Sequence, residues 1–247
     1  MSDLPSESLH PHPPLWTDLG LRANVTLTAE QLDRLSRYLD LLLAANRTMN
    51  LTRIVDRAPA EVQHVGDALT LLPFLPAGPH RLADVGSGGG VPGIPLAIAR
   101  ADAQVLLVES TKKKAGFLRA AAEQLGLQNV RVSEQRAEDV GRVGSPEREA
   151  FDVVIARAVG TLDWLVEWCL PLARKGGKML AMKGQKVAEE LPAAAKAIRA
   201  LNGGEPVVHK TDLPGAEHHV VVEIVKAGKG DPRYPRPATQ AKGKPIR

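Results

Sequence analysis

Residues 81–99 constrain the fold of this chain more than any other stretch, because they read as a strand, a glycine turn and a helix. A short apolar run ends abruptly in a turn that contains four glycines: Gly86, Gly88, Gly89 and Gly90. Glycine accepts positive φ angles and lets the backbone approach a ligand closely. Residues 96–99, Leu-Ala-Ile-Ala, then continue as a buried helix behind Pro95 in its first turn. A helix N-terminus behind such a turn is a site for the polar end of a ligand.

The glycine spacing distinguishes among the cofactors that use such a turn. A dinucleotide fingerprint is G-x-G-x-x-G directly after a strand, but Val91 stands here at the sixth position. With Asp84 before it, the turn matches the D-x-G-x-G-x-G pattern of S-adenosylmethionine (SAM) methyltransferases. The next apolar run, residues 104–109, ends in Glu109, 23 residues after Gly86, where an acid can bind both hydroxyls of an adenosine ribose. The alternative is an ordinary glycine-rich loop.

Three further segments accompany the turn, which reads DVGSGGGVPGIPL over residues 84–96. They are NLTRI at 50–54, ARAV at 156–159, and the ending YPR at 234–236 with KGKP at 242–245. Together the four resemble the RsmG (GidB) family, bacterial methyltransferases that modify a guanine at N7 in 16S ribosomal RNA. The chain departs from the family at Ala156, where members often carry serine. The resemblance extends over about residues 30–247.

The resemblance implies an enzyme that methylates guanine N7 in 16S ribosomal RNA, free or in the small subunit, with SAM as cofactor and S-adenosylhomocysteine as product. The residues expected to bind the cofactor follow the first four strands: Gly86, Gly88, Val91, Glu109, Ser110, Thr111, Ala137, Glu138 and Arg157. Those expected to bind RNA are basic: Arg53, Lys112, Lys113, Lys183 and Arg236. Glu138 also fits a plain loop acid, Arg157 a surface ion pair, and the lysines a solvated helix start.

Strand and helix patterns alternate from residue 81 onward. Strands are expected at 81–85, 104–109, 129–133, 151–156, 176–182 and 219–226, with a weaker one at 206–210. Helices are expected at 93–100, 112–125, 161–173 and 185–201. Alternation of this kind predicts an α/β fold with a doubly wound, mostly parallel seven-stranded sheet, closed by an antiparallel hairpin of the last two strands. This is the Rossmann-like, class I methyltransferase type, whose ligands lie at the C-terminal strand ends.

Four segments are expected: a loosely ordered extension over 1–24, a helical cap over 25–80, a SAM-binding domain over 81–226 and a basic tail over 227–247. Thr28 and Gln31 have capping-box spacing and open a helix. A second helix is expected over 59–72, where His64 and Asp67 share a face. The polar loop at 50–54 is expected near the mouth of the site, with a helix terminus and its capping residues as the alternative.

Charge and composition indicate the partners. The net charge is +4, but the stretch from Lys226 to Arg247 holds seven basic residues and one acid, so it carries +6 and the rest sums to −2. A basic tail suits a polyanion such as RNA, and the alternative is a passive, solvated extension. The single cysteine, the absence of an apolar run of membrane length and the absence of a signal peptide indicate a soluble cytoplasmic protein. We expect a monomer.

No catalytic residue and no metal are assigned. Guanine N7 has an in-plane lone pair and no hydrogen, so its methylation requires alignment rather than a general base. Residues 156–159 lack the Asp/Asn-Pro-Pro-aromatic motif of amino-group methyltransferases, and Cys169 lies mid-helix, away from the strand ends. The competing hypotheses are a SAM enzyme acting on a small molecule or protein, a non-catalytic RNA-binding assembly protein, and a nicotinamide oxidoreductase.

Overall fold

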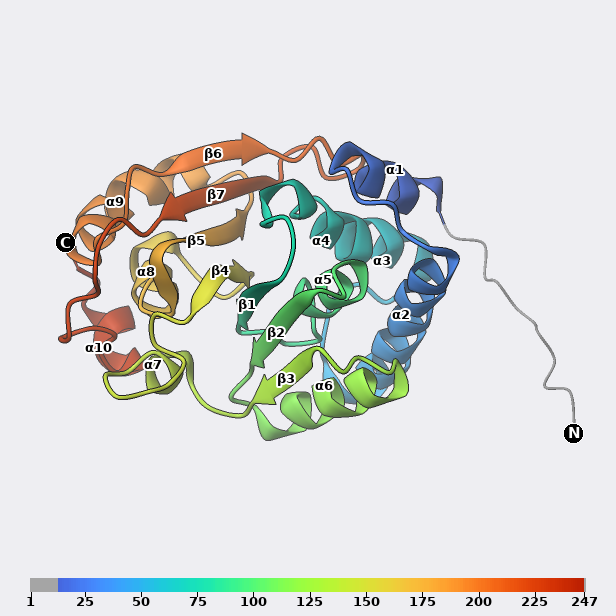
Figure 1. Cartoon of the computed structure of the whole chain (residues 1–247), viewed down its shortest axis with the longest axis horizontal. Helices are drawn as coiled ribbons and strands as arrows, with labels where there is room; N and C mark the ends of the chain where they lie inside the picture. The colour runs from blue at the N-terminus through green and yellow to red at the C-terminus, as the bar shows by residue number, and fades with distance from the viewer. Residues whose placement is uncertain (1–12, 247) are drawn as a thin grey trace, which may run out of the picture.

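Seven strands form one sheet in the order β3-β2-β1-β4-β5-β7-β6. Figure 1 shows the sheet with helices on either side. The computed structural model describes residues 13–246. The strands are β1 (His80–Val85), β2 (Ala103–Val108), β3 (Val130–Ser133), β4 (Phe151–Arg157), β5 (Ala173–Lys183), β6 (Val207–Lys210) and β7 (Val220–Val225). The first five run parallel, whereas β7 is antiparallel to both β5 and β6. The expected doubly wound sheet with its closing hairpin is confirmed.

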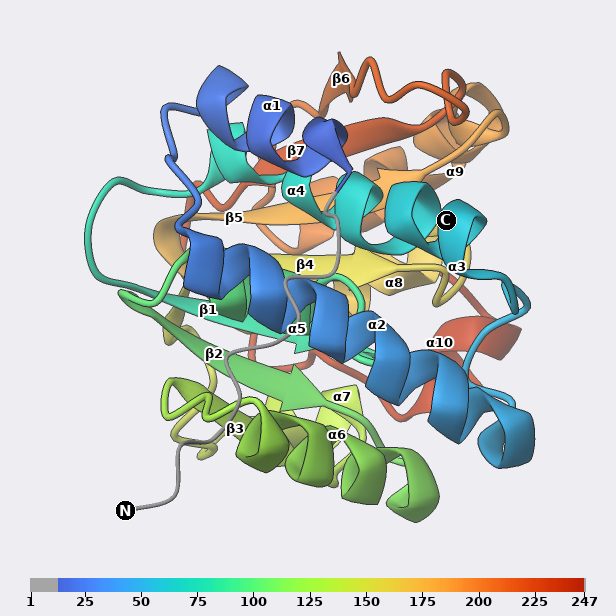
Figure 2. The same cartoon turned by 90° about the vertical axis from the view of Figure 1, so that its right-hand side faces the viewer.

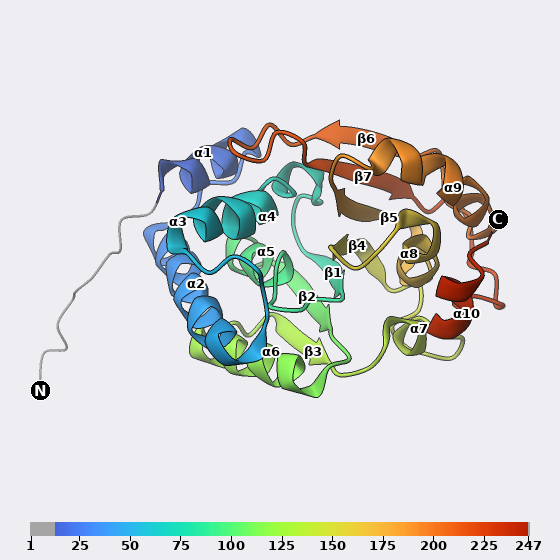
Figure 3. The ribbon, with the colours of Figure 1, turned by 180° about the vertical axis from the view of Figure 1, so that it is seen from behind.

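Helices cover both faces of the sheet. On one face lie α1 (Pro14–Arg22), α2 (Ala29–Met49), α3 (Arg57–Ala60), the π-helix η1 (Glu61–Gly66), α4 (Asp67–Leu69), the 3-10 turn η2 (Leu72–Phe74), α5 (Gly93–Ala99) and α6 (Lys112–Gln124), as Figure 2 shows. On the other lie α7 (Ala137–Val140), α8 (Leu162–Cys169), α9 (Val187–Ala200) and α10 (Ala238–Gly243), seen in Figure 3. The right-handed crossovers of parallel strands produce this two-sided cover.

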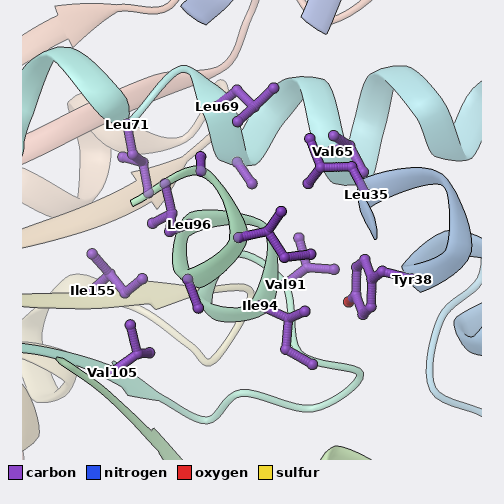
Figure 4. Close-up of a cluster of buried hydrophobic side chains, with 14 of the residues drawn as sticks. Leu35, Tyr38, Val65, Leu69, Leu71, Val91, Ile94, Leu96, Val105 and Ile155 are labelled. Carbon is purple, nitrogen blue, oxygen red and sulfur yellow. The ribbon is translucent and has the colours of Figure 1, made fainter. Parts of the chain in front are cut away.

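Each face has its own hydrophobic core because neighbouring residues of a strand point to opposite sides. On β1, Leu82 packs under α2 and α5, while Ala83 packs with α8. Figure 4 shows the first core, in which Tyr38 of α2, Val65 of η1, Ile94 of α5 and Ile155 of β4 belong to one cluster of buried side chains. The helices over residues 14–74 therefore share one continuous core with the sheet.

Several element boundaries differ from expectation for local reasons. The helix expected over 161–173 ends at Cys169, because Pro171 follows closely and disfavours helix before it. The helix expected over 59–72 is divided into α3, η1, α4 and η2. Within the stretch expected as a loose extension, Pro13 and Pro14 start α1, since the fixed φ of proline suits a helix N-terminus. Residues 1–12 of that stretch lie outside the described residues.

The first long helix begins and ends with side-chain caps. Thr28 Oγ1 accepts from the Gln31 backbone N–H, and the Gln31 side chain accepts from the Thr28 N–H, which confirms the capping box. The helix continues past Asn46 to Met49, and Asn50 ends it in the left-handed conformation. From inside the helix, Asn46 Oδ1 accepts the N–H groups of Leu51 and Thr52 at 2.7 and 2.9 Å. One amide side chain thus positions the polar loop at 50–54.

The C-terminal segment folds back over the α7 and α8 side (Figure 3). Lys226 is fully buried and donates to Glu149 Oε1 at 2.9 Å, and Lys242 lies 4.7 Å from the ring centre of Trp164. Its cations are therefore partly used to attach the segment to the protein. Across residues 13–246, no helix has the length and apolar character needed to cross a membrane.

Candidate functional site

The glycine turn after β1 is packed tightly everywhere except at Gly88. A Cβ at Gly86 would lie 2.7 Å from Val159 Cγ2, and one at Gly90 would lie 2.6 Å from Ile94 Cδ1. At Gly88, whose φ is +55°, the nearest atom to such a Cβ is the Gly86 carbonyl oxygen at 3.8 Å. The Gly88 side of the glycine turn therefore faces open space, which is part of a cavity.

Glu109, which follows β2, holds the turn in place. Its Oε2 accepts from the Gly88 N–H at 3.0 Å, and its Oε1 accepts from the Thr111 N–H at 2.7 Å. The residue is 8% exposed, so the carboxylate lies at the edge of the cavity rather than on the open surface. A carboxylate has about four acceptor positions, so two remain for hydroxyl groups of a ligand.

Asp84 lies beneath the turn as a buried carboxyl group. Its Oδ2 accepts from the Gly93 N–H at 3.1 Å, whereas Oδ1 has no hydrogen-bond partner within residues 13–246. Burial raises the pKa of Asp84 to about 7, against the lowering effect of the Gly93 N–H. An incompletely satisfied buried carboxyl group makes this part of the site favourable for positive charge.

A cavity of about 1080 Å³ lies at the C-terminal ends of the parallel strands. We call it the larger cavity, because a smaller one lies beside it. Five of the residues expected to bind the cofactor line it: Gly86, Gly88, Val91, Glu109 and Arg157. The polar loop at 50–54 and His64 line its other side. The structure therefore brings the turn, the end of β2 and the end of β4 together around one space, as the switch-point rule predicts.

The other four expected cofactor residues lie outside that lining. Ser110 and Thr111 are exposed at the start of α6, and Ala137 and Glu138 are buried in α7. The Glu138 carboxylate accepts from the Ala238 N–H of α10 at 3.3 Å. The proposed contacts of these residues with the adenosine stay predictions.

The N-terminal helices form one wall of the turn itself. The Tyr38 hydroxyl of α2 donates to the Gly89 carbonyl oxygen at 2.7 Å, and a Cβ at Gly89 would lie 2.7 Å from Leu42 Cδ1. Tyr38 is fully buried, and burial raises the pKa of its hydroxyl far above the ordinary value, so it acts only as a neutral donor. The backbone of the turn therefore depends on α2 for its shape.

A network of four polar side chains and one backbone carbonyl group lies at the end of β4. Arg157 donates to Asp67 Oδ2 at 3.0 Å, to the Gln63 carbonyl oxygen at 2.7 Å and to His64 Nδ1 at 3.2 Å. His219, just before β7, lies with Nδ1 3.0 Å from Asp67 Oδ1. Ala158, the next residue after Arg157, has a φ of +56°, a strained conformation of the kind found at functional sites.

His64 is held neutral in this network. His64 Nδ1 lies 3.2 Å from an Arg157 nitrogen, which can only donate, and 3.2 Å from the Gln63 carbonyl oxygen, while Nε2 lies 2.9 Å from Thr52 Oγ1. Burial, followed by the charge of Arg157, lowers the pKa of His64 to about 4. The hydrogen bond to Asp67 has the opposite effect on His219 and raises its pKa.

Sequence reasoning did not assign His219 to the site, although it lines the larger cavity together with Thr52 of the 50–54 loop and Lys114. For His219 the signal was a polar residue immediately before an apolar strand, but its relevance depends on strand direction. Only because β7 is antiparallel does its N-terminal end lie at the edge where the parallel strands have their C-terminal ends.

The basic residues expected to bind RNA fall into two groups. Arg53, Lys112 and Lys113 are exposed, and within residues 13–246 none of them has an ion-pair partner. Lys183, by contrast, pairs with Glu190 at 2.6 Å, and Arg236 pairs with the fully buried Glu167 at 2.6 Å. The last two therefore direct their hydrogen bonds into the protein.

The structure also describes the surroundings of the cysteine thiol and the arrangement of possible metal ligands. Cys169 is fully buried at the end of α8, and burial raises the pKa of its thiol far above the usual value, so the thiolate is strongly disfavoured. In the described part of the chain, no group of three or more His, Cys, Asp or Glu residues is arranged to hold a metal ion. The expectation that no metal takes part stays a prediction.

Comparison with known proteins places the chain in context. The family model GidB, rRNA small subunit methyltransferase G, matches residues 31–220. The ribosomal RNA small subunit methyltransferase G of Chloroflexus aggregans is 42% identical over 212 residues, which are 86% of this chain and 89% of that protein. The protein of the same name from Sorangium cellulosum is 51% identical over 173 residues, 69% of this chain and 72% of that protein. The one from Lactobacillus delbrueckii subsp. bulgaricus is 38% identical over 242 residues, 95% and 100% of the two chains.

Solved structures match at the level of the fold. Cofactor-bound Rv0187 from MTB has a TM-score of 0.55 and 20% identity, covering 78% of this chain and 91% of that chain. M. jannaschii TYW2 in complex with AdoMet has a TM-score of 0.50 and 18% identity, covering 70% and 77%. The arrangement of sheet and helices is therefore shared with cofactor-binding proteins whose sequences have diverged widely.

Proposed function

The chain belongs to the GidB family, rRNA small subunit methyltransferase G, and from this premise we propose that it transfers the methyl group of SAM to N7 of a guanine in 16S ribosomal RNA. The observation that carries the proposal is the open Gly88 side of the turn, facing a cavity that has the Glu109 carboxylate at its edge. An anionic carboxylate beside an open glycine turn suits the ribose of an adenosine.

The residues present fit SAM. Gly88 leaves room that any Cβ would reduce, and Glu109 keeps two acceptor positions for ribose hydroxyls. Asp84 lies beneath the turn with one carboxyl oxygen unpartnered, and burial raises its pKa to about 7, so a nearby cationic sulfonium or amino group would favour its charged form. Val91 and Leu42 give the cavity an apolar wall.

When bound, SAM would supply an electrophilic methyl group to the N7 lone pair, with the electron pair of the broken S–CH3 bond left on sulfur. Because N7 carries no hydrogen, the protein would need no general base for this transfer. The task of the protein is alignment, which can supply on the order of 7–11 kcal/mol of the barrier. The ion pair of Arg157 with Asp67 and the hydrogen bond of Tyr38 to Gly89 hold the cavity walls rigid for that alignment.

RNA binds, in this proposal, to the exposed cations around the larger cavity. Arg53 lies on its rim, and Lys112 and Lys113 begin α6 next to it, with Lys114 in the cavity wall. Phosphate contacts of this kind position a nucleic acid without reading its sequence. We place the protein in the cytoplasm, acting as a monomer without a metal, on small-subunit RNA or the assembled subunit.

The decisive experiment is transfer of labelled methyl from SAM to small-subunit ribosomal RNA, both free and as assembled particles. The product is then cleaved chemically at 7-methylguanine. Label at one cleavable guanine is the expected result. Label on RNA without cleavage would contradict N7 as the target atom. No label on any RNA, with SAM binding intact, would favour a small-molecule or protein substrate instead.

A further inference from the structure

A second, smaller cavity of about 300 Å³ lies beside the larger one. Arg157, Ala158 and His219 line both cavities, so these three residues form their common boundary. The smaller cavity lies at the C-terminal ends of β4 and β5 and at the start of β7. Glu109 lines the larger cavity and not the smaller one.

The walls of the smaller cavity suit a flat heteroaromatic ring. Leu165, Met182 and Val220 supply apolar surface from three different elements. A flexible, polarizable methionine packs well against an aromatic ring. A base rotated out of its stack needs a pocket of this kind, apolar on its faces and polar at its edge.

The boundary between the cavities offers hydrogen-bond donors that no protein group uses. Arg157 makes three hydrogen bonds through its terminal nitrogens, and within residues 13–246 its Nε has no partner. His219 uses Nδ1 toward Asp67, and its Nε2 likewise has no partner in the described part of the chain. The hydrogen bond to Asp67 favours the protonated ring, in which Nε2 is a donor.

The neighbouring charges are already balanced inside the protein. Asp67 is 2% exposed, and its two oxygens face Arg157 and His219. Lys183, in the wall of the smaller cavity, pairs with Glu190. The carboxylates beside the boundary are therefore already paired with cations of the protein.

We propose that the smaller cavity receives the target base, and that Arg157 and His219 at the boundary donate to O6 of guanine so that N7 faces the larger cavity. O6 and N7 are adjacent acceptors on the same edge of guanine. A donor at the boundary that binds O6 therefore leaves the neighbouring N7 beside the bound methyl group. This inference rests on the proposed function and adds to it the residues that select the base.

The same arrangement disfavours adenine. Adenine carries an amino group, a donor, at the position that O6 occupies in guanine. Donors facing a donor would be left unpaired, and a site built to hydrogen-bond one group discriminates strongly against a base that lacks it. His219 and Arg157 are thus positioning and specificity-determining residues.

The test uses His219→Ala, with His218→Ala as its matched control. His218 is the adjacent residue, its ring lies 4.8 Å from that of His219, and it lines neither cavity. Methyl transfer is measured on RNA in which the mapped target guanine is kept, or replaced by inosine, which retains O6, or by 2-aminopurine, which lacks it. SAM affinity is measured separately by calorimetry.

The unaltered protein should accept inosine and lose at least about tenfold in kcat/KM on 2-aminopurine. His219→Ala should lose roughly tenfold on guanine and show a smaller further loss on 2-aminopurine, because both changes remove the same hydrogen bond. SAM affinity should stay within about twofold. Equal guanine rates for the two histidine variants, or an undiminished 2-aminopurine penalty in His219→Ala, would overturn the subsite.

A second pair of variants tests the cavity without touching a polar group. Gly184 lines the smaller cavity, and a Cβ there meets only His218 Cδ2 at 3.8 Å, so Gly184→Leu can be accommodated while it fills space. Ala193→Leu adds bulk on the exposed face of α9 as a control. Gly184→Leu should lose RNA methylation and keep SAM binding, and normal methylation would overturn the subsite. If the unaltered protein labels no RNA, the proposed function fails as well.

Discussion

The Arg157 guanidinium lies 3.0 Å from the Asp67 carboxylate, and this ion pair ties the end of β4 to the N-terminal helices. Asp67 is 2% exposed, so its charge depends on Arg157 and His219 for compensation. Breaking a buried pair by removing one partner typically costs about 3–5 kcal/mol. The helices over residues 14–74 are thus connected to the sheet both by apolar packing and by a polar link that lies within the candidate site.

His64, which accepts from Arg157, should make folding stability depend on pH. Its pKa is about 4 in the folded protein against 6.5 for the ordinary side chain, so between these values the unfolded chain binds a proton that the folded chain does not. Stability from this source is complete above pH 6.5 and is lost as the pH falls toward 4, by at most about 3 kcal/mol.

The measurement is urea unfolding of the unaltered protein and of His64→Gln at several pH values from 7 to 4. The difference between the two isolates His64, because Asp84, whose raised pKa of about 7 makes stability fall as the pH rises, is common to both. The variant should lose less stability than the unaltered protein toward pH 4. Parallel curves would contradict the assignment, and the exposed His218→Gln serves as control.

Gly88→Val should abolish SAM binding while the fold survives. The branched side chain enters the open side of the turn, and the φ of +55° is unfavourable for valine by about 1–2 kcal/mol. Gly126→Val is the matched control, since Gly126 has a φ of +66°, open space around it and no place in either cavity. Calorimetric titration with SAM checks the result, and equal affinity in both variants would remove Gly88 from the site.

Glu109→Ala should weaken SAM binding by about 1–3 kcal/mol through loss of a charge-assisted hydrogen bond to the ribose. Thermal unfolding without SAM is measured in parallel, because the N–H groups of Gly88 and Thr111 lose their acceptor. Glu123→Ala, an exposed acid of α6, is expected to bind SAM normally. An affinity for SAM that matches this control would exclude the ribose role.

The double variant Lys112→Ala, Lys113→Ala should weaken RNA binding and flatten its salt dependence. Each lost contact to a single-stranded phosphate lowers the slope of log K against log salt by about 0.7, so the pair should lower it by about 1.4. Lys196→Ala, on exposed α9 across the sheet, is the control. An unchanged slope would show that these lysines form only a solvated helix start.

Arg236→Ala should act mainly on stability. Glu167 is fully buried, and Arg236 donates to both of its oxygens through side-chain nitrogens at 2.8 and 2.6 Å. Its removal leaves the buried carboxylate without a countercharge and with the backbone N–H of residue 236 as its remaining donor from this segment, so the expected loss is about 3–5 kcal/mol in unfolding free energy. Arg233→Ala breaks only an exposed pair with Asp231 and should unfold like the unaltered protein. RNA affinity lost without a change in stability would instead favour a direct RNA contact for Arg236.

Local sequence patterns predicted a helix cap, turn or strand well where residues close together in the chain form it. The capping box at Thr28, the turn at Gly86–Gly90 and the apolar strands depend on residues a few positions apart, and all are observed. Element ends were less predictable. From inside α2, the Asn46 side chain accepts the N–H groups of Leu51 and Thr52 in the loop that follows the helix.

The sequence by itself determined the sheet, the turn and Glu109 at the second strand end, because glycine spacing and apolar periodicity act over short distances along the chain. Only the tertiary structure decided that His219 lies beside Asp67, 152 positions away, that Tyr38 supports the turn at Gly89, and that Arg236 turns inward to Glu167. These pairings depend on strand direction and on which buried charge needs a partner. Both are set by the packing of whole elements, which no local pattern records.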